Sequence, residues 1–122
     1  METRLIKNQK LTFNDSGELL VYVDESVETF TADYSEIKSD LEIITPTTDY
    51  YIEIKDIFVS SATGTGAVSL TGATSGTIFK VYLTNQQSYT SGKLHLDLTT
   101  NEKLRVSCPA NTFIAITYYL DN

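Results

Sequence analysis

The chain has 122 residues, a formal net charge of −7 and one cysteine. This length fits a single domain, which can bury about two-thirds of the surface that its unfolded chain exposes. The negative charge disfavours nucleic acid as a partner, because contact with phosphates needs a basic face. A single cysteine, Cys108, excludes an internal disulfide and a zinc site built from cysteines.

The start of the chain, METRLIKNQK, contains charges but lacks the apolar segment of a signal peptide. No later stretch approaches the length of a membrane span. We therefore expect a soluble protein that is made in the cytoplasm and has no membrane partner.

The residue types favour strands over helices. Threonine and serine are abundant, alanine is scarce, and there are eight tyrosines and five phenylalanines. Aromatic and β-branched residues fit a pleated surface better than a helix. The composition predicts an all-β protein.

Residues 4–23 are predicted to form a hairpin. Residues 4–7 and 10–13 are short apolar segments that we interpret as an edge strand broken by a bulge or kink. Turn-forming residues at 14–17 follow, and ELLVYV at 18–23 has the composition of a strand.

Strands are predicted at residues 27–31 and 41–45, with one helical turn at 34–38 that Ser35 could cap. Seven acidic residues and one basic residue lie between Asp24 and Glu42. Such a run is most often a solvated rim. A cation site and a patch for a basic partner are the alternatives.

Residues 49–61 form a strong strand signal with a change of phase. Ile52 and Ile54 alternate with polar residues, and Ile57 and Val59 then fall on the opposite parity. A one-residue slip that keeps the apolar set together predicts a β-bulge, or a bend where a strand changes sheet.

The second half of the chain shows strand signals at intervals of about 8–12 residues, which is typical of a β-sandwich or barrel. A polar connection is predicted at 85–92. Strands are predicted at residues 68–70, 77–83, 93–98, 103–107 and 113–120.

The segment 113–120 is apolar on both faces. In an antiparallel sheet this indicates burial on both sides. Either a loop of the same subunit covers the second face, or sister subunits cover it around a symmetry axis. The residues predicted for such an oligomer interface are Phe113, Ala115, Ile116, Tyr118, Tyr119 and Leu120.

Other candidate sites have simpler explanations. His95, the only histidine, shares a strand face with Asp97, and such a pair could orient a general base. The alternation is nevertheless that of a solvated charge pair on an ordinary strand. We therefore predict no catalytic residue, metal site or cofactor. Exposed tyrosines could stack on sugar rings, although tyrosine is also an ordinary strand residue. The possible glycan contacts are Tyr50, Tyr51, Tyr82 and Tyr89.

The segments YYIEIKDIFVSSATGTGAVSL and KLHLDLTTNEKLRVSCPANTFIAITYYLDN resemble the small jelly-roll modules of tailed-phage virions. These modules serve as capsid decoration, head-fibre or tail-tip proteins, and their shape is distantly similar to the trimeric tumour-necrosis-factor and C1q jelly rolls. The resemblance covers residues 46–122 and consists of the strand pattern. Residues 1–45 either complete the sandwich or form an attachment segment.

The resemblance implies a single antiparallel jelly-roll β-sandwich of about 8–10 short strands. It also implies a non-enzymatic structural protein of the virion: a homotrimer with residues 113–120 near the three-fold axis, fixed to a capsid or tail component. The alternative is a carbohydrate-binding or receptor-binding module with the same fold, because a fold does not determine function.

Overall fold

The computed structural model describes the backbone of residues 2–6, 9–13, 19–24 and 27–122, and side chains from residue 27 onward. This part of the chain consists of strands and loops, so the all-β prediction is confirmed, and none of it forms a helix that could cross a membrane. The strands are β1 (Glu2–Ile6), β2 (Gln9–Phe13), β3 (Leu19–Asp24), β4 (Glu28–Tyr34), β5 (Lys38–Ile44), β6 (Tyr51–Ser61), β7 (Gly66–Gly72), β8 (Gly76–Leu83), β9 (Ser88–Thr90), β10 (Leu96–Asp97), β11 (Leu104–Cys108) and β12 (Thr112–Asp121).

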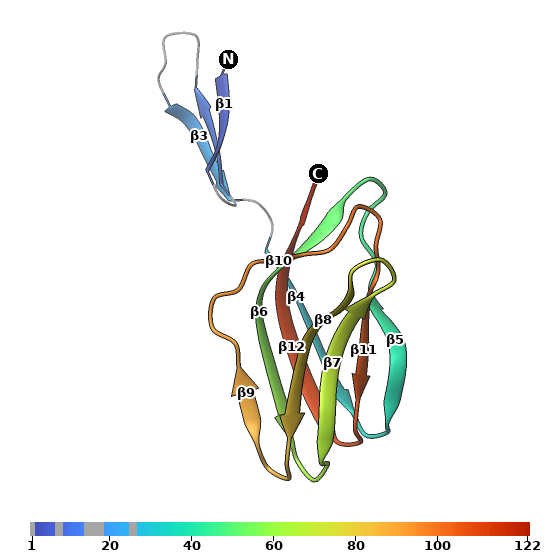
Figure 1. The fold of residues 1–122 in the computed structure, drawn as a ribbon. Coiled ribbons are helices and arrows are strands. Elements are labelled where there is room, and N and C mark those ends of the chain that lie inside the picture. Colours follow the sequence, from blue (N-terminus) through green and yellow to red (C-terminus); the bar gives the residue numbers. More distant parts are fainter. Residues whose placement is uncertain (1, 7–8, 14–18, 25–26) are drawn as a thin grey trace.

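The first three strands form an antiparallel sheet of their own, in the order β1-β2-β3. Figure 1 shows this sheet standing apart from the rest of the fold. The pairing of β2 with β3 confirms the predicted hairpin, whereas the predicted turn at 14–17 lies outside the described residues. The prediction of one broken edge strand is wrong, because β1 and β2 pair with each other. Folding back gives the backbone groups of both segments a partner.

The remaining strands form two antiparallel sheets that pack face to face as a sandwich (Figure 1). One sheet has the order β10-β6-β12-β4, with β9 also paired to β6, and the other has the order β5-β11-β7-β8. The core between the sheets is made of aliphatic side chains that alternate with outward-facing ones. Its fully buried members include Ile52, Ile54, Ile57, Val59, Val68, Leu70, Leu104, Val106, Ile114 and Ile116.

The strands β4 and β5 confirm the two strands predicted before residue 46, and both belong to the sandwich. The predicted helical turn between them is wrong. Tyr34 is the last residue of β4 and Lys38 the first of β5, so the chain passes from one sheet to the other in three residues. A single helical turn has too few hydrogen bonds to form without packing.

The phase change in β6 is a β-bulge. Thr117 of β12 pairs with Asp56 and Tyr118 pairs with Ile54, so Lys55 has no residue opposite it. The extra residue restores the core-facing direction of Ile57 after the slip. The bulge therefore keeps the isoleucines and the valine of this eleven-residue strand in one core.

The edge beside β6 differs from the prediction. The predicted connection at 85–92 contains the strand β9, and the predicted strand at 93–98 contributes only the short β10. The backbone nevertheless follows β6 between them, because the amides of Ser91 and Leu94 donate to the carbonyls of Ile57 and Lys55 at 2.9 and 2.7 Å. The ladder is interrupted opposite the bulge, so β9 and β10 act as one broken edge strand.

Candidate functional site

The strand β12 lies between β6 and β4, with one face on the subunit's own core. Ile116 is fully buried there, and Tyr118 and Leu120 pack against the same core. These three candidate interface residues therefore contribute to the interior of the sandwich.

The opposite face of β12 carries the other candidates. Phe113 and Ala115 are partly exposed, whereas Tyr119 is buried. The ring of Phe113 meets that of Phe58 from β6 edge to face, with centroids 6.1 Å apart. Ala115 pairs directly with Phe58. We call Phe58, Phe113 and Ala115 the outer patch.

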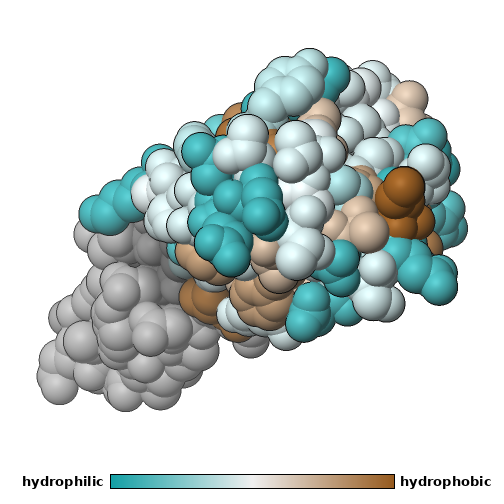
Figure 2. Space-filling view, turned by 90° about the horizontal axis from the view of Figure 1, so that it is seen from below, coloured by the Kyte–Doolittle hydropathy of each residue, from teal (hydrophilic) through white to brown (hydrophobic). Residues whose placement is uncertain are grey.

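Polar residues of β4 border the outer patch. Thr31 pairs with Ala115 and Asp33 pairs with Phe113, and both β4 side chains are exposed. The sandwich surface seen end-on in Figure 2 has a similar character, with small hydrophobic areas among hydrophilic and neutral ones. The outer patch is therefore a limited apolar area with a polar margin.

The candidate glycan-contact tyrosines do not gather in one place. Tyr50 precedes β6 and Tyr51 opens it, whereas Tyr89 of β9 pairs with the other end of β6. Tyr89 packs on Phe79, with ring centroids 5.6 Å apart. Tyr82 lies in the other sheet and its side chain is 72% exposed. One shallow groove therefore cannot use all four rings.

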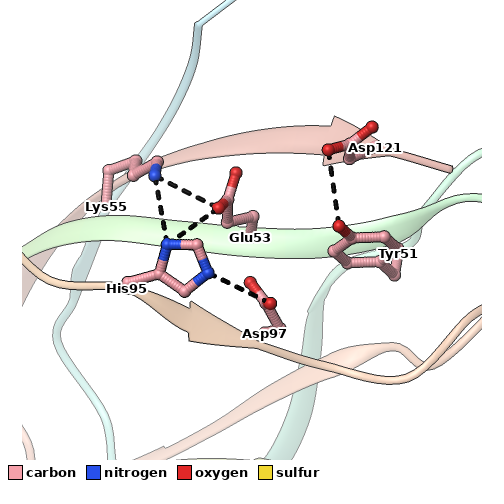
Figure 3. Close-up of polar contacts among 6 residues, drawn as sticks. All are labelled: Tyr51, Glu53, Lys55, His95, Asp97 and Asp121. Carbon is pink, nitrogen blue, oxygen red and sulfur yellow. Dashed lines mark hydrogen bonds and ion pairs between the residues drawn. The ribbon is translucent and has the colours of Figure 1, made fainter. Parts of the chain in front are cut away.

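A polar cluster surrounds His95 at the β6–β10 pairing (Figure 3). Its Nδ1 atom lies 3.0 Å from Oε1 of Glu53, and its Nε2 atom lies 3.1 Å from Oδ2 of Asp97. The ammonium of Lys55 contacts the same Glu53 oxygen at 3.1 Å. The His95–Asp97 pair was predicted, but the cross-strand partner Glu53 was missed, because only the β6–β10 register brings it there.

The same sheet face continues toward the end of β12. The hydroxyl of Tyr51 lies 3.4 Å from Oδ2 of Asp121. Burial raises the pKa of Tyr51 above its ordinary value, and the negative charge of the Asp121 carboxylate raises it further. The ammonium of Lys55 lies 5.3 Å from the ring centroid of Tyr119, which suits a cation–π contact. We call Glu53, Lys55, His95 and Asp97 the histidine cluster.

A second buried carboxylate, Glu102, joins two loops of the sandwich. Its oxygens accept hydrogen bonds from the amides of Thr74 and Ser75, the hydroxyl of Ser75, and the amide and hydroxyl of Thr99, at 2.5 to 3.1 Å. Burial alone would raise the pKa of Glu102, but the bonds from Ser75, Thr99 and Thr74 outweigh it and lower the pKa to about 2. Glu102 therefore holds the β7–β8 turn against the loop before β11.

In its described part, the acidic segment forms ion pairs with basic residues on and next to the neighbouring strand of the same sheet. Glu42 lies 3.3 Å from Lys103 and 3.6 Å from Arg105, at a shallow polar groove. The described acidic residues from 28 to 42 are all exposed. They form a hydrated margin to which Lys103 and Arg105 add compensating charge.

No known protein family, curated protein or solved structure matches this chain.

Proposed function

We propose that this protein is a non-enzymatic structural component of a tailed-phage virion, built as a jelly roll and assembled as a homotrimer on a capsid or tail surface. The order of the strands in the two sheets is the observation that carries this proposal. The outer patch and the separate N-terminal sheet add to it.

The strand order fits a jelly roll when β9 and β10 count as one interrupted strand. The sandwich then has eight strands, with β12 between β4 and β6 in one sheet and β11 between β5 and β7 in the other. An eight-stranded roll of two Greek keys places its last strand between its first and third, and its seventh between its second and fourth. Capsid and lectin domains use this architecture.

The outer patch supports self-association. Phe58 and Phe113 bring two aromatic rings to the solvent side of the central strands, where a packed partner would complete their burial. Three copies around an axis parallel to β12 would bury this face at a common centre. The interface proposed here thus keeps Phe113 and Ala115, adds Phe58, and leaves Ile116 to the core.

The N-terminal sheet supports a role in attachment. Among the residues that the structure describes, the strands β1 to β3 pair with one another and with no strand of the sandwich, whereas β4 and β5 complete the sandwich. A small sheet that shares no ladder with the main domain is suited to contact another protein. The attachment region proposed here is therefore residues 2–24.

Light scattering at low and high protein concentration tests the assembly. We expect a trimer mass for the natural chain and a smaller mass for Phe113→Ser, which removes the central ring of the outer patch. Tyr82→Ser is the matched control, because that exposed ring lies on the other sheet and should leave the mass unchanged. A monomer at every concentration would refute the trimer.

Mass spectrometry of purified phage particles tests the location. Particles whose genome encodes this chain should contain its peptides in amounts comparable with those of other structural proteins. Complete particles that lack the chain would rule out the virion role, whatever its oligomeric state.

A further inference from the structure

We propose that Glu53, His95 and Asp97 of the histidine cluster bind a divalent transition-metal ion of the zinc type. One donor atom from each side chain lies within 4.8 Å of the donors of the other two. An imidazole nitrogen and carboxylate oxygens are ligands that Zn²⁺ accepts. The site goes beyond the structural role proposed above and does not depend on it.

The donor spacing suits a metal ion. Zinc bonds of about 2.0–2.2 Å in tetrahedral geometry place neighbouring ligand atoms about 3.3–3.6 Å apart. The two contacts of His95 are made by opposite ring nitrogens, Nδ1 at 3.0 Å to Oε1 of Glu53 and Nε2 at 3.1 Å to Oδ2 of Asp97. Each contact alone is only a little shorter than the separation of two ligands of one ion. An ion held by one of these nitrogens and its carboxylate would take the second carboxylate as a ligand once that side chain rotates away from the other nitrogen, within the 4.8 Å that separates the three donor atoms.

Exposure allows these rotations and the remaining coordination. The side chains of His95 and Asp97 are 56% and 41% exposed, whereas that of Glu53 is 10% exposed. The ring nitrogen that does not bind the ion can be solvated, and water can fill the open coordination positions. Glu53 provides the fixed ligand, and Asp97 of β10 and His95, which directly precedes β10, close on it.

Lys55 shows that the cluster already holds a positive charge. Its ammonium lies 3.1 Å from Oε1 of Glu53 and 3.5 Å from Nδ1 of His95, so two of the proposed ligand atoms converge on it. The two carboxylates exceed this single ammonium in charge. A divalent ion that displaced this ammonium from Glu53 would balance the two carboxylates, and Lys55 could remain over the ring of Tyr119.

The strand pairing fixes the site in advance. Asp97 pairs with Glu53 across the β6–β10 ladder, and β6 is held on its other side by β12. Ligands on paired strands keep their relative positions better than ligands on loops. The bulge places Lys55, whose side chain competes with the metal, next to Glu53 in the same cluster.

Calorimetric titration of the untagged, chelator-treated protein with zinc chloride tests the proposal. We expect saturable binding of one ion per chain and a loss of affinity of at least about 10-fold in both His95→Asn and Glu53→Gln. His95 is the only histidine, so the first variant removes the only imidazole of the chain. The only cysteine, Cys108, is buried. Glu36→Gln, an exposed acid between β4 and β5, is the control and should bind as the natural chain does.

Lys55→Met provides a test that misfolding cannot imitate. Removal of the competing ammonium should tighten zinc binding about 3-fold or more, since the ion no longer displaces a charge of its own sign. Equal zinc affinity in His95→Asn and the natural chain would overturn the proposal. An absence of saturable binding, or weaker binding in Lys55→Met with its circular dichroism spectrum unchanged, would also do so.

Discussion

Replacement of Glu102 by glutamine should destabilise the fold and remove part of its acid sensitivity. The residue is only 5% exposed, and its carboxylate accepts bonds from the turn between β7 and β8 and from Thr99. Glutamine keeps the shape but has one acceptor oxygen, and its NH₂ group would face amide donors. At least one of these backbone amides then loses its partner.

The lowered pKa gives the magnitude. Burial opposes ionisation, yet the hydrogen bonds lower the pKa of Glu102 from 4.5 to about 2. Each pH unit of that difference corresponds to about 1.4 kcal/mol, so ionised Glu102 contributes about 3 kcal/mol to the free energy of unfolding. Because the folded pKa is below the unfolded one, this contribution is complete above about pH 4.5 and is lost as the pH falls toward 2.

Thermal unfolding followed by circular dichroism measures both effects. At pH 7 Glu102→Gln should lower the free energy of unfolding by about 2–4 kcal/mol and the melting temperature by about 10 °C. The difference in the free energy of unfolding between the natural chain and Glu102→Gln should narrow between pH 4.5 and 2, where Glu102 of the natural chain becomes protonated. Glu36→Gln, at an exposed position, should change stability by less than about 0.5 kcal/mol. A difference in stability that does not change with pH, or an unchanged melting temperature of Glu102→Gln, would refute the reasoning.

Three further predictions concern close contacts and burial. Gly72→Ala would place a Cβ against the carboxylate of Glu102, which its hydrogen bonds hold in place, so we expect a loss of about 1–3 kcal/mol in chemical denaturation. In Gly64→Ala the new Cβ would meet the backbone oxygen of Ala110, which cannot rotate away, so the loss of stability should be at least as large. Melting temperatures equal to that of the natural chain would contradict the predictions for Gly72→Ala and Gly64→Ala. Burial raises the pKa of the Cys108 thiol, so a disulfide reagent should label it only after unfolding, and rapid labelling of the folded protein would disprove this.

The sequence predicted features that depend on a single strand. The bulge in β6 was predictable because Ile54 and Ile57 must face the same core and their spacing breaks the alternation of a strand. The buried face of β11 followed from its strict alternation in the same way. The prediction of a helical turn at 34–38 was wrong, because so short a segment does not distinguish the start of a helix from a crossing between two sheets.

Features that depend on the neighbour of a strand were not predictable. His95 and Asp97 are two residues apart in the sequence, but Glu53 belongs to the strand β6, whose pairing with β10 no local pattern encodes. The role of Glu102 had one local signal, the spacing from Thr99 to Glu102, which resembles that of a capping box. Its contacts with the turn between β7 and β8 required the fold.

The central position of β12 has a consequence for synthesis on the ribosome. Both of its partners, β4 and β6, emerge before it, and until it arrives each has an open edge toward the gap that it fills. Such long-range pairing is slow, and unpaired edges in nascent chains can associate with one another. Translation that stops before residue 112 therefore yields a sheet divided at its middle, and the sandwich closes only when the last strand inserts.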